Sequence, residues 1–85
     1  MEKYKVKIKK SAQKDILSFP KKEIKKILSA IEDLAINPRG ANCKKLSGEE
    51  KYRKRVGNYR ILYQIEDDVL VVNVVKVAHR KEVYR

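Results

Sequence analysis

The chain is short of the residues that build disulfide bridges and metal sites. Its 85 residues include one cysteine, Cys43, one histidine, His79, and no tryptophan. A single cysteine excludes an intramolecular disulfide, and one cysteine with one histidine cannot complete a usual structural zinc site. The sequence also lacks a P-loop, a dinucleotide fingerprint and a nucleophile triad. We therefore expect neither a metal nor a cofactor.

Long apolar runs are missing as well. No stretch is long enough to cross a membrane, and there is no apolar region of the signal-peptide type. These absences predict a protein of the reducing cytoplasm without a membrane partner. A length of 85 residues allows one domain, residues 1–85, with a single two-layer core.

Acidic residues are few in comparison with basic ones. The 22 lysines and arginines face 11 aspartates and glutamates, which gives a net charge of +11. The apolar fraction and its clear periodicity argue against disorder, so the excess of cations belongs to a folded domain. An anionic partner is predicted, and the alternative is that the charge only keeps a small domain in solution.

The first half of the chain predicts one strand and two helices. Over residues 3–9 apolar side chains alternate with lysines, as in a strand with one buried face. Ser11 is placed to cap a short helix that Pro20 interrupts. Apolar residues at helical spacing predict a second helix from Ile24 to Ala35, which the segment 37–40 ends. Four lysines near its start are interpreted as a solvated face, with phosphate contact as the alternative: Lys21, Lys22, Lys25 and Lys26.

The second half is rich in predicted strands. A short strand is possible near residues 44–46, and the Gly57-Asn58 break within residues 51–66 is a two-residue hairpin signal that suits a type II′ turn. After a turn at Asp67-Asp68, the nearly apolar run from Val69 to Val77 predicts a central strand, covered on both faces for part of its length. The order of elements predicts a two-layer α+β domain: an N-terminal strand, a helical hairpin, and a mainly antiparallel sheet of four to five strands.

The hairpin should bring three arginines together. Residues that flank a two-residue turn pair with each other, and successive pairs alternate between sheet faces. Arg53, Arg55 and Arg60 therefore share one face, which we expect to lie away from the helices and open to a ligand. Lys54 points to the helical side and should lie near an edge of the sheet. Because crowded guanidinium groups repel one another and folding does not require them, the cluster predicts binding to a polyanion.

The end of the chain adds a group suited to proton transfer. If the last strand pairs with residues 59–66, His79 and Arg80 emerge beside the arginine face. Imidazole exchanges protons near neutral pH, whereas arginine stays protonated and suits phosphate binding. Metal-free RNA cleavage needs a base for the 2′-hydroxyl, cations for the phosphate and an acid for the leaving 5′-oxygen. Tyr84 is suited to stack on an unpaired base or to orient the phosphate. The alternative for His79 is a structural or incidental role.

Three motifs in order resemble the RelE/ParE superfamily of toxin–antitoxin toxins, and most closely its RelE branch. They are residues 45–48 (KLSG), 52–63 (YRKRVGNYRILY) and 79–84 (HRKEVY), and the similarity covers nearly the whole chain. The resemblance implies a RelE-like, microbial-RNase-like fold. It also implies cleavage of messenger RNA in the ribosomal A site without a metal, leaving a 2′,3′-cyclic phosphate, with ribosomal RNA as a further partner. A cognate RelB-like antitoxin would silence the toxin.

The resemblance carries the family's site onto positions of this chain. The expected catalytic residues are Arg53, Arg55, Arg60, His79, Arg80 and Tyr84. The expected RNA-binding residues are Lys44, Lys45, Lys54, Lys81 and Arg85. The best-studied pattern of the family has lysines where Arg53 and Arg55 stand, and one of these lysines is the usual base candidate, a role that arginine fits poorly. Either His79 carries the proton or cleavage is slow. Two alternatives are a ParE-like inhibitor of DNA gyrase and a nucleic-acid-binding module without catalysis.

Overall fold

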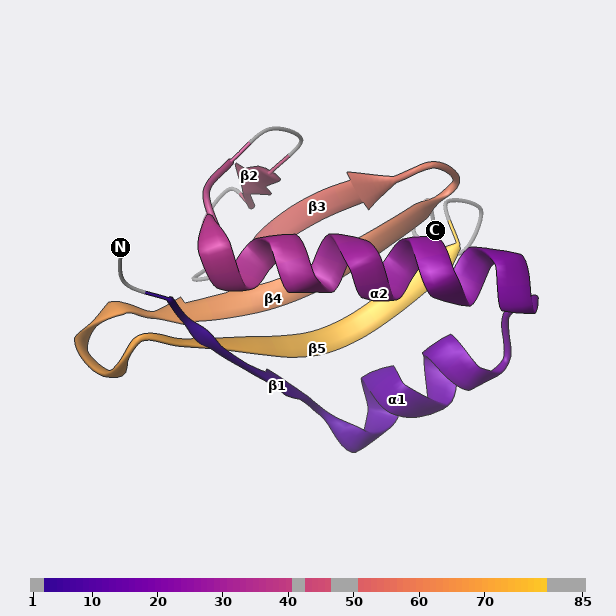
Figure 1. Cartoon of the computed structure of the whole chain (residues 1–85), viewed down its shortest axis with the longest axis horizontal. Coiled ribbons are helices and arrows are strands. Elements are labelled where there is room, and N and C mark those ends of the chain that lie inside the picture. Colours follow the sequence, from indigo (N-terminus) through magenta and orange to yellow (C-terminus); the bar gives the residue numbers. More distant parts are fainter. Residues whose placement is uncertain (1–2, 41–42, 47–50, 80–85) are drawn as a thin grey trace.

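The protein forms two layers, with two helices on one face of a five-stranded sheet (Figure 1). The computed structural model describes residues 3–40, 43–46 and 51–79. The elements are β1 (Lys5–Ile8), α1 (Lys10–Leu17), α2 (Lys21–Ile36), β2 (Cys43–Lys45), β3 (Tyr52–Val56), β4 (Tyr59–Glu66), the 3-10 helix η1 (Asp67–Val69) and β5 (Val71–His79). The strand order is β1-β5-β4-β3-β2, and only β1 runs parallel to its neighbour. The predicted α+β architecture is confirmed.

The helices supply one side of a single core. The buried residues of α2 lie on one stripe, as the periodicity predicted: Ile27, Ala30, Ile31 and Leu34. With Ala12 and Ile16 of α1 they pack on the buried sheet residues Tyr59, Ile61, Tyr63, Val72, Val74 and Val77. Tyr63 is fully buried, and its hydroxyl donates a hydrogen bond of 2.6 Å to the carbonyl of Pro38. This bond ties the chain just after α2 to the middle strand, and burial raises the pKa of Tyr63 far above its usual value.

Helix α1 covers the edge of β5 where β1 no longer pairs with it. The hydroxyl of Ser11 donates to the carbonyl of Val75 at 3.3 Å, and the carboxylate of Asp15 accepts from the amide of Val77 at 3.2 Å. Side chains of the helix thus satisfy backbone groups that a neighbouring strand would otherwise pair. The prediction that Ser11 caps this helix is wrong. The helix begins at Lys10, so Ser11 lies inside it, and the hydroxyl of Ser11 donates to β5 instead.

The β3–β4 hairpin has the predicted register. Val56 pairs with Tyr59, and Arg55 pairs with Arg60. Gly57 has a φ of +56°, and no positive φ is found at the second turn position. A type II′ turn needs positive φ at the first central residue only, which glycine adopts without a steric cost.

Strand β5 is an interior strand, as predicted, although β4 occupies the middle of the sheet. Consecutive residues are buried at both of its ends, Val71 with Val72 and Val77 with Ala78. Successive side chains of a strand point to opposite faces, so both faces are covered at these positions. This agrees with the nearly apolar composition of the run.

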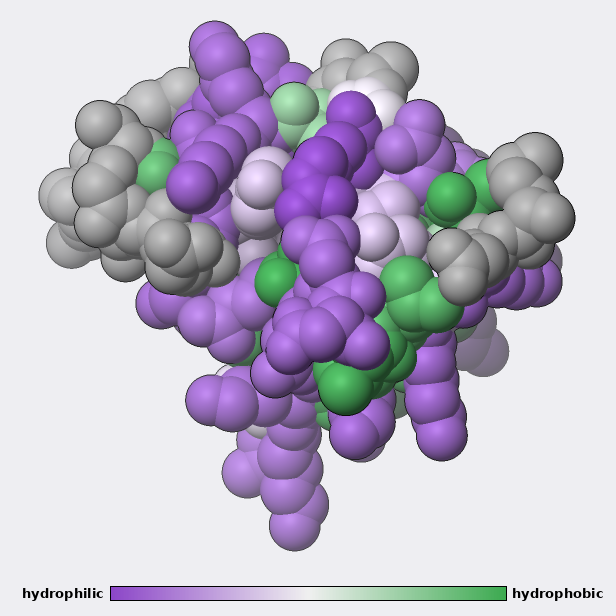
Figure 2. Space-filling model, turned by 90° about the vertical axis from the view of Figure 1, so that its left-hand side faces the viewer, coloured by the Kyte–Doolittle hydropathy of each residue, from purple (hydrophilic) through white to green (hydrophobic). Residues whose placement is uncertain are grey.

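A polar network joins four segments that are distant in the sequence, at the end of the sheet next to η1. Arg39 donates to both carboxylate oxygens of Asp67 at 3.1 and 2.8 Å, and the hydroxyl of Tyr4 donates to the same carboxylate at 2.7 Å. The guanidinium of Arg39 also lies over the ring of Tyr52, 5.4 Å from its centroid. Hydrophilic side chains cover most of the end of the molecule where the β4–β5 turn lies (Figure 2).

Candidate functional site

The sheet face away from the helices gathers most of the strand cations. Cross-strand pairs share a face, so the register identifies the residues that point away from the core. Its basic residues are Lys5, Lys7, Lys44, Arg53, Arg55, Arg60 and Lys76. Glu66 is the one acidic strand residue on this face within the described part of the chain, and it accepts a hydrogen bond from Asn73 at 2.8 Å. We call this surface the basic sheet face.

A hollow opens on this face over β2 and β3. It encloses about 390 Å³ and is lined by Lys44, Arg53, Arg55 and the partly buried Cys43. Lys44 and Arg53 are direct partners, and Arg55 follows Arg53 by two residues, a step of roughly 6.6 Å along a strand. Among residues 3–40, 43–46 and 51–79, three cations border the hollow and no acid does. An anion placed there would offset their mutual repulsion.

Arg60 belongs to this face but not to its surface. It is paired with Arg55, yet it is only 3% exposed, and its partner on the other side, Ala78, is buried too. The prediction that Arg60 is open to a ligand is therefore wrong. A charge at this depth is costly to bury unless the surrounding protein compensates it, so replacing Arg60 should affect packing as well as the charge of the face.

His79 reaches the expected end of β4 but lies on the other side of the sheet. It pairs with Tyr59, and the two rings meet edge to face with centroids 5.2 Å apart. Tyr59 in turn packs on Phe19, from the α1–α2 connection, at 4.6 Å. The side chain of His79 is thus on the helical side. The prediction that His79 approaches the arginine face is therefore wrong, because its ring points to the opposite side of the sheet.

The remaining predicted site residues fall into two groups. Lys45 pairs with Tyr52 and Lys54 pairs with Ile61, so both lysines point to the helical side of the sheet. Lys54 is partly buried and lies one strand from the edge, as predicted. Four expected residues lie outside the described part of the chain: Arg80, Lys81, Tyr84 and Arg85.

Three cations of the basic sheet face were missed by the hairpin argument. Lys5 and Lys7 are on this face because β1 joins the sheet beside β5. Lys76 of β5 is also there, with its ammonium 3.9 Å from the carboxylate of Asp15. The alternating lysines of residues 3–9 did signal an exposed side of β1. The sequence did not show that this side continues the arginine face.

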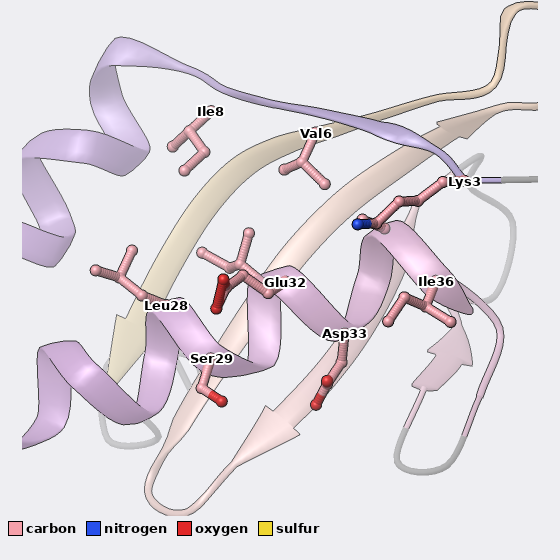
Figure 3. A pocket seen from close by; sticks show the side chains of 10 residues that line it. Lys3, Val6, Ile8, Leu28, Ser29, Glu32, Asp33 and Ile36 are labelled. Carbon is pink, nitrogen blue, oxygen red and sulfur yellow. The ribbon is translucent and has the colours of Figure 1, made fainter.

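A second hollow lies between β1 and α2 (Figure 3). It encloses about 680 Å³, and its apolar lining includes Val6 and Ile8 from β1 and Leu28 and Ile36 from α2. Glu32 also borders it. This groove therefore differs in chemistry from the basic sheet face.

Residues 3–40, 43–46 and 51–79 contain no group of three histidine, cysteine, aspartate or glutamate side chains that could hold a metal ion. No helix in these ranges has the length and apolar character that a membrane span requires.

The two-layer α+β domain is the fold that the resemblance to RelE-like toxins implies, and it agrees with solved structures of that kind. Residues 6–84 match the family described as ParE toxin of type II toxin–antitoxin system, parDE. The chain belongs to this family, and thus to the RelE/ParE superfamily of type II toxin–antitoxin toxins. The resemblance found in the sequence is confirmed.

Relatives with RelE names share both sequence and structure with the chain. It is 32% identical to RelE1 of Methanocaldococcus jannaschii, over 98% of this chain and 97% of the relative. It is similar to a chain of the toxin–antitoxin complex RelBE2 from Mycobacterium tuberculosis, with a TM-score of 0.85, 29% identity and 94% of each chain covered. For the archaeal RelE–RelB complex from Pyrococcus horikoshii OT3, the TM-score is 0.83 at 30% identity, covering 92% of this chain and 96% of the other.

Proposed function

We propose that the chain is an endoribonuclease that cleaves messenger RNA in the ribosomal A site and so inhibits translation. The observation that carries the proposal is the hollow of about 390 Å³ bordered by Lys44, Arg53 and Arg55. It lies on the sheet face that the helices leave open. Cations fixed around a phosphate stabilise the negative charge that develops during phosphoryl transfer. In this proposal the scissile phosphate binds over the hollow, with ribosomal RNA contacting the surrounding lysines.

The proposed reaction needs no external nucleophile. The 2′-oxygen attacks the adjacent phosphorus as its proton leaves, the bond from phosphorus to the 5′-oxygen breaks, and that oxygen takes up a proton. The products are a 2′,3′-cyclic phosphate and a 5′-hydroxyl end. Arginine is a poor base, so we assign Arg53 and Arg55 to binding and charge stabilisation rather than to proton transfer. Following the resemblance, we assign Arg80 to phosphate binding and Tyr84 to stacking on a base.

A cleavage assay with translating ribosomes, without antitoxin, tests the proposal. We expect the purified chain to cut messenger RNA bound to ribosomes and to leave 2′,3′-cyclic ends. The variant Arg53→Gln/Arg55→Gln should lose this cleavage. Its matched control, Lys22→Gln/Lys26→Gln, removes the same charge from the helical side and should retain it. Cleavage at the unchanged rate in the first variant would contradict the assignment.

We further propose a RelB-like antitoxin as a cytoplasmic partner. The similar structures from M. tuberculosis and P. horikoshii are both complexes of toxin with antitoxin. An acidic antitoxin segment on the basic sheet face would neutralise the cations that RNA requires. Antitoxin and RNA should then compete, which a fluorescence displacement assay measures. Simultaneous binding at unchanged affinity would refute direct occlusion.

Inhibition of DNA gyrase is the second candidate function. The family that residues 6–84 match is described as ParE toxin, and the alternative drawn from the sequence is a ParE-like inhibitor of gyrase. The family description therefore favours this alternative. A supercoiling assay with gyrase, run on the same preparation as the ribosome assay, separates the two functions. Loss of supercoiling together with intact messenger RNA would replace the first proposal by the second.

A further inference from the structure

The exposed side of α2 carries a charge pattern that is complementary to itself. Lys21 and Lys25 lie in its first half, Leu28 and Ser29 near its middle, and Glu32 in its second half, all exposed. Their spacing of three and four residues places them in one row along the helix. The helix dipole favours acids at the start and bases at the end, the reverse of this order. Helix stability therefore does not explain the pattern.

Apolar side chains lie in the same row. Leu28 is 43% exposed and Ile36 is 57% exposed, although both are large hydrophobic residues. Both line the groove of about 680 Å³ between α2 and β1, across from Val6 and Ile8 (Figure 3). Apolar surface rimmed by charged residues is characteristic of a protein interaction site.

We propose that this surface binds a second copy of the chain, with the two α2 helices antiparallel. A twofold axis that passes between positions 28 and 29 puts Lys25 opposite Glu32 of the second copy. It puts Lys21 opposite Ile36, where the aliphatic stem of the lysine can cover the apolar side chain. A twofold interface uses the same patch twice, so the relation between Lys25 and Glu32 yields two ion pairs.

A second copy is a suitable partner because neither Lys25 nor Glu32 has an ion-pair partner within the described part of its own chain. The ion pairs found in residues 3–40, 43–46 and 51–79 involve neither Lys25 nor Glu32. The positions four residues from Lys25 are Lys21 and Ser29, so no acid is available one turn away. An acidic partner would repel Glu32, and a basic partner would repel Lys25. Another copy of α2 in antiparallel orientation matches both.

The association should be weak and reversible. A helix of 16 residues is about 24 Å long, and one helix pair buries less than the roughly 1,600 Å² of a standard interface. A net charge of +11 on each copy adds repulsion at longer range. Added salt screens this repulsion more than it screens pairs in contact. We expect a dimer that forms at high protein concentration and is strengthened by moderate salt.

The proposed interface is independent of the proposed RNA site. Helix α2 covers one face of the sheet, and the basic sheet face is the other (Figure 1). A dimer joined through α2 leaves both basic sheet faces accessible. The self-association can therefore fail or hold whatever the outcome of the cleavage assay.

Sedimentation equilibrium of the purified chain over a concentration series tests the proposal, with circular dichroism to verify folding. Lys25→Glu and Glu32→Lys should each weaken the dimer about tenfold, because each places like charges together twice. The double variant Lys25→Glu/Glu32→Lys exchanges the charges on both copies and should restore association. The matched control Lys26→Glu has the same charge change one position further along α2, outside the row, and should behave as the unmodified chain.

The apolar contact is tested in the same way. Leu28→Ser should weaken the dimer, whereas Leu17→Ser, which alters a residue of α1 that is 78% exposed, should not. A monomer at every concentration, or a double variant that fails to restore association, would overturn the proposal. A monomeric chain that loses antitoxin binding through Glu32→Lys would assign the groove to the antitoxin and overturn it as well.

Discussion

Arg55 and Arg60 are direct partners across β3 and β4, yet Arg55 is exposed and Arg60 is 3% exposed. Two arginines of one face thus stand in different environments. Arg55 can touch a bound phosphate directly, and truncating it leaves the core intact. Arg60 lies below the surface, so its removal should also change packing. Substitutions at the two positions should therefore be separable by stability.

For Arg55→Ala we expect cleavage on ribosomes to slow by roughly 10²–10³-fold, the usual effect of removing one preorganised group that stabilises developing charge. The melting temperature should stay unchanged because the side chain is exposed. Single-turnover cleavage and thermal unfolding measure the two quantities on the same preparation. A variant that cleaves normally would remove Arg55 from the site.

For Arg60→Ala we expect a loss of stability as well as of cleavage. Truncating a buried side chain typically lowers the free energy of unfolding by about 1–3 kcal/mol, and Arg60 is almost fully buried. If Arg60 were open to a ligand, as the sequence predicts, the variant would keep an intact fold. Denaturant unfolding of Arg60→Ala and of the milder Arg60→Lys decides between a loss of stability and an intact fold. An unchanged unfolding midpoint in both variants would show that burial of Arg60 does not contribute to stability.

The lysines of β1 should take part in RNA binding. Each cation that binds a phosphate releases counterions, so affinity falls steeply as salt rises. We expect Lys5→Gln/Lys7→Gln to reduce the slope of log affinity against log salt by roughly two, one for each lysine replaced. Lys22→Gln/Lys26→Gln removes two charges from the helical side and serves as the control. Equal effects in both variants would mean that RNA does not select the basic sheet face.

The register of the hairpin could be predicted from the sequence because it depends on local chemistry. Gly57 permits the turn, and the alternation of apolar and basic residues fixes which side of β3 and β4 is buried. The depth of Arg60 could not be predicted, because it depends on what other parts of the chain cover. The same holds for Lys5 and Lys7, whose place on the basic sheet face depends on the parallel pairing of β1 with β5.

The face occupied by His79 depends on a single extra residue. Tyr63 pairs with Val74 but Leu62 pairs with Lys76, so the register shifts by one between them. Without that shift Tyr59 would pair with Ala78, and His79 would fall on the basic sheet face. A bulge of one residue reverses the side of every later residue in the strand. The sequence from Val71 to Val77 contains no signal that predicts this bulge. The predicted position along β4 was right, and the side was wrong.

A substitution at His79 can therefore separate packing from proton transfer. His79→Phe keeps an aromatic ring against Tyr59 but cannot carry a proton, whereas His79→Ala removes both. Because the ring lies on the helical side, we expect His79→Phe to cleave within a few-fold of the unmodified chain with the same pH profile. The measurement is single-turnover cleavage on ribosomes across neutral pH. Loss of activity together with loss of a pH transition would make His79 the proton carrier after all.

The last prediction concerns Asp67 and the pH dependence of stability. Hydrogen bonds from Arg39, and then from Tyr4, lower the pKa of this carboxyl below its usual value of about 3.9. A carboxyl with a depressed folded pKa stabilises the fold above the unfolded value, and this contribution is lost as pH falls through the folded value. Asp67→Asn should thus lower the melting temperature at pH 6–7, and the difference from the unmodified chain should shrink below about pH 4.

Asp68→Asn is the matched control for this prediction, because it makes the same change at the next exposed residue of η1. Arg39→Gln should reproduce the pH dependence of Asp67→Asn, since it removes the other half of the pair. The pair is largely exposed, so the effect should be modest and should decrease in high salt. Equal shifts for Asp67→Asn and Asp68→Asn at every pH would show that overall charge, rather than the bond between Arg39 and Asp67, sets the stability of this end of the sheet.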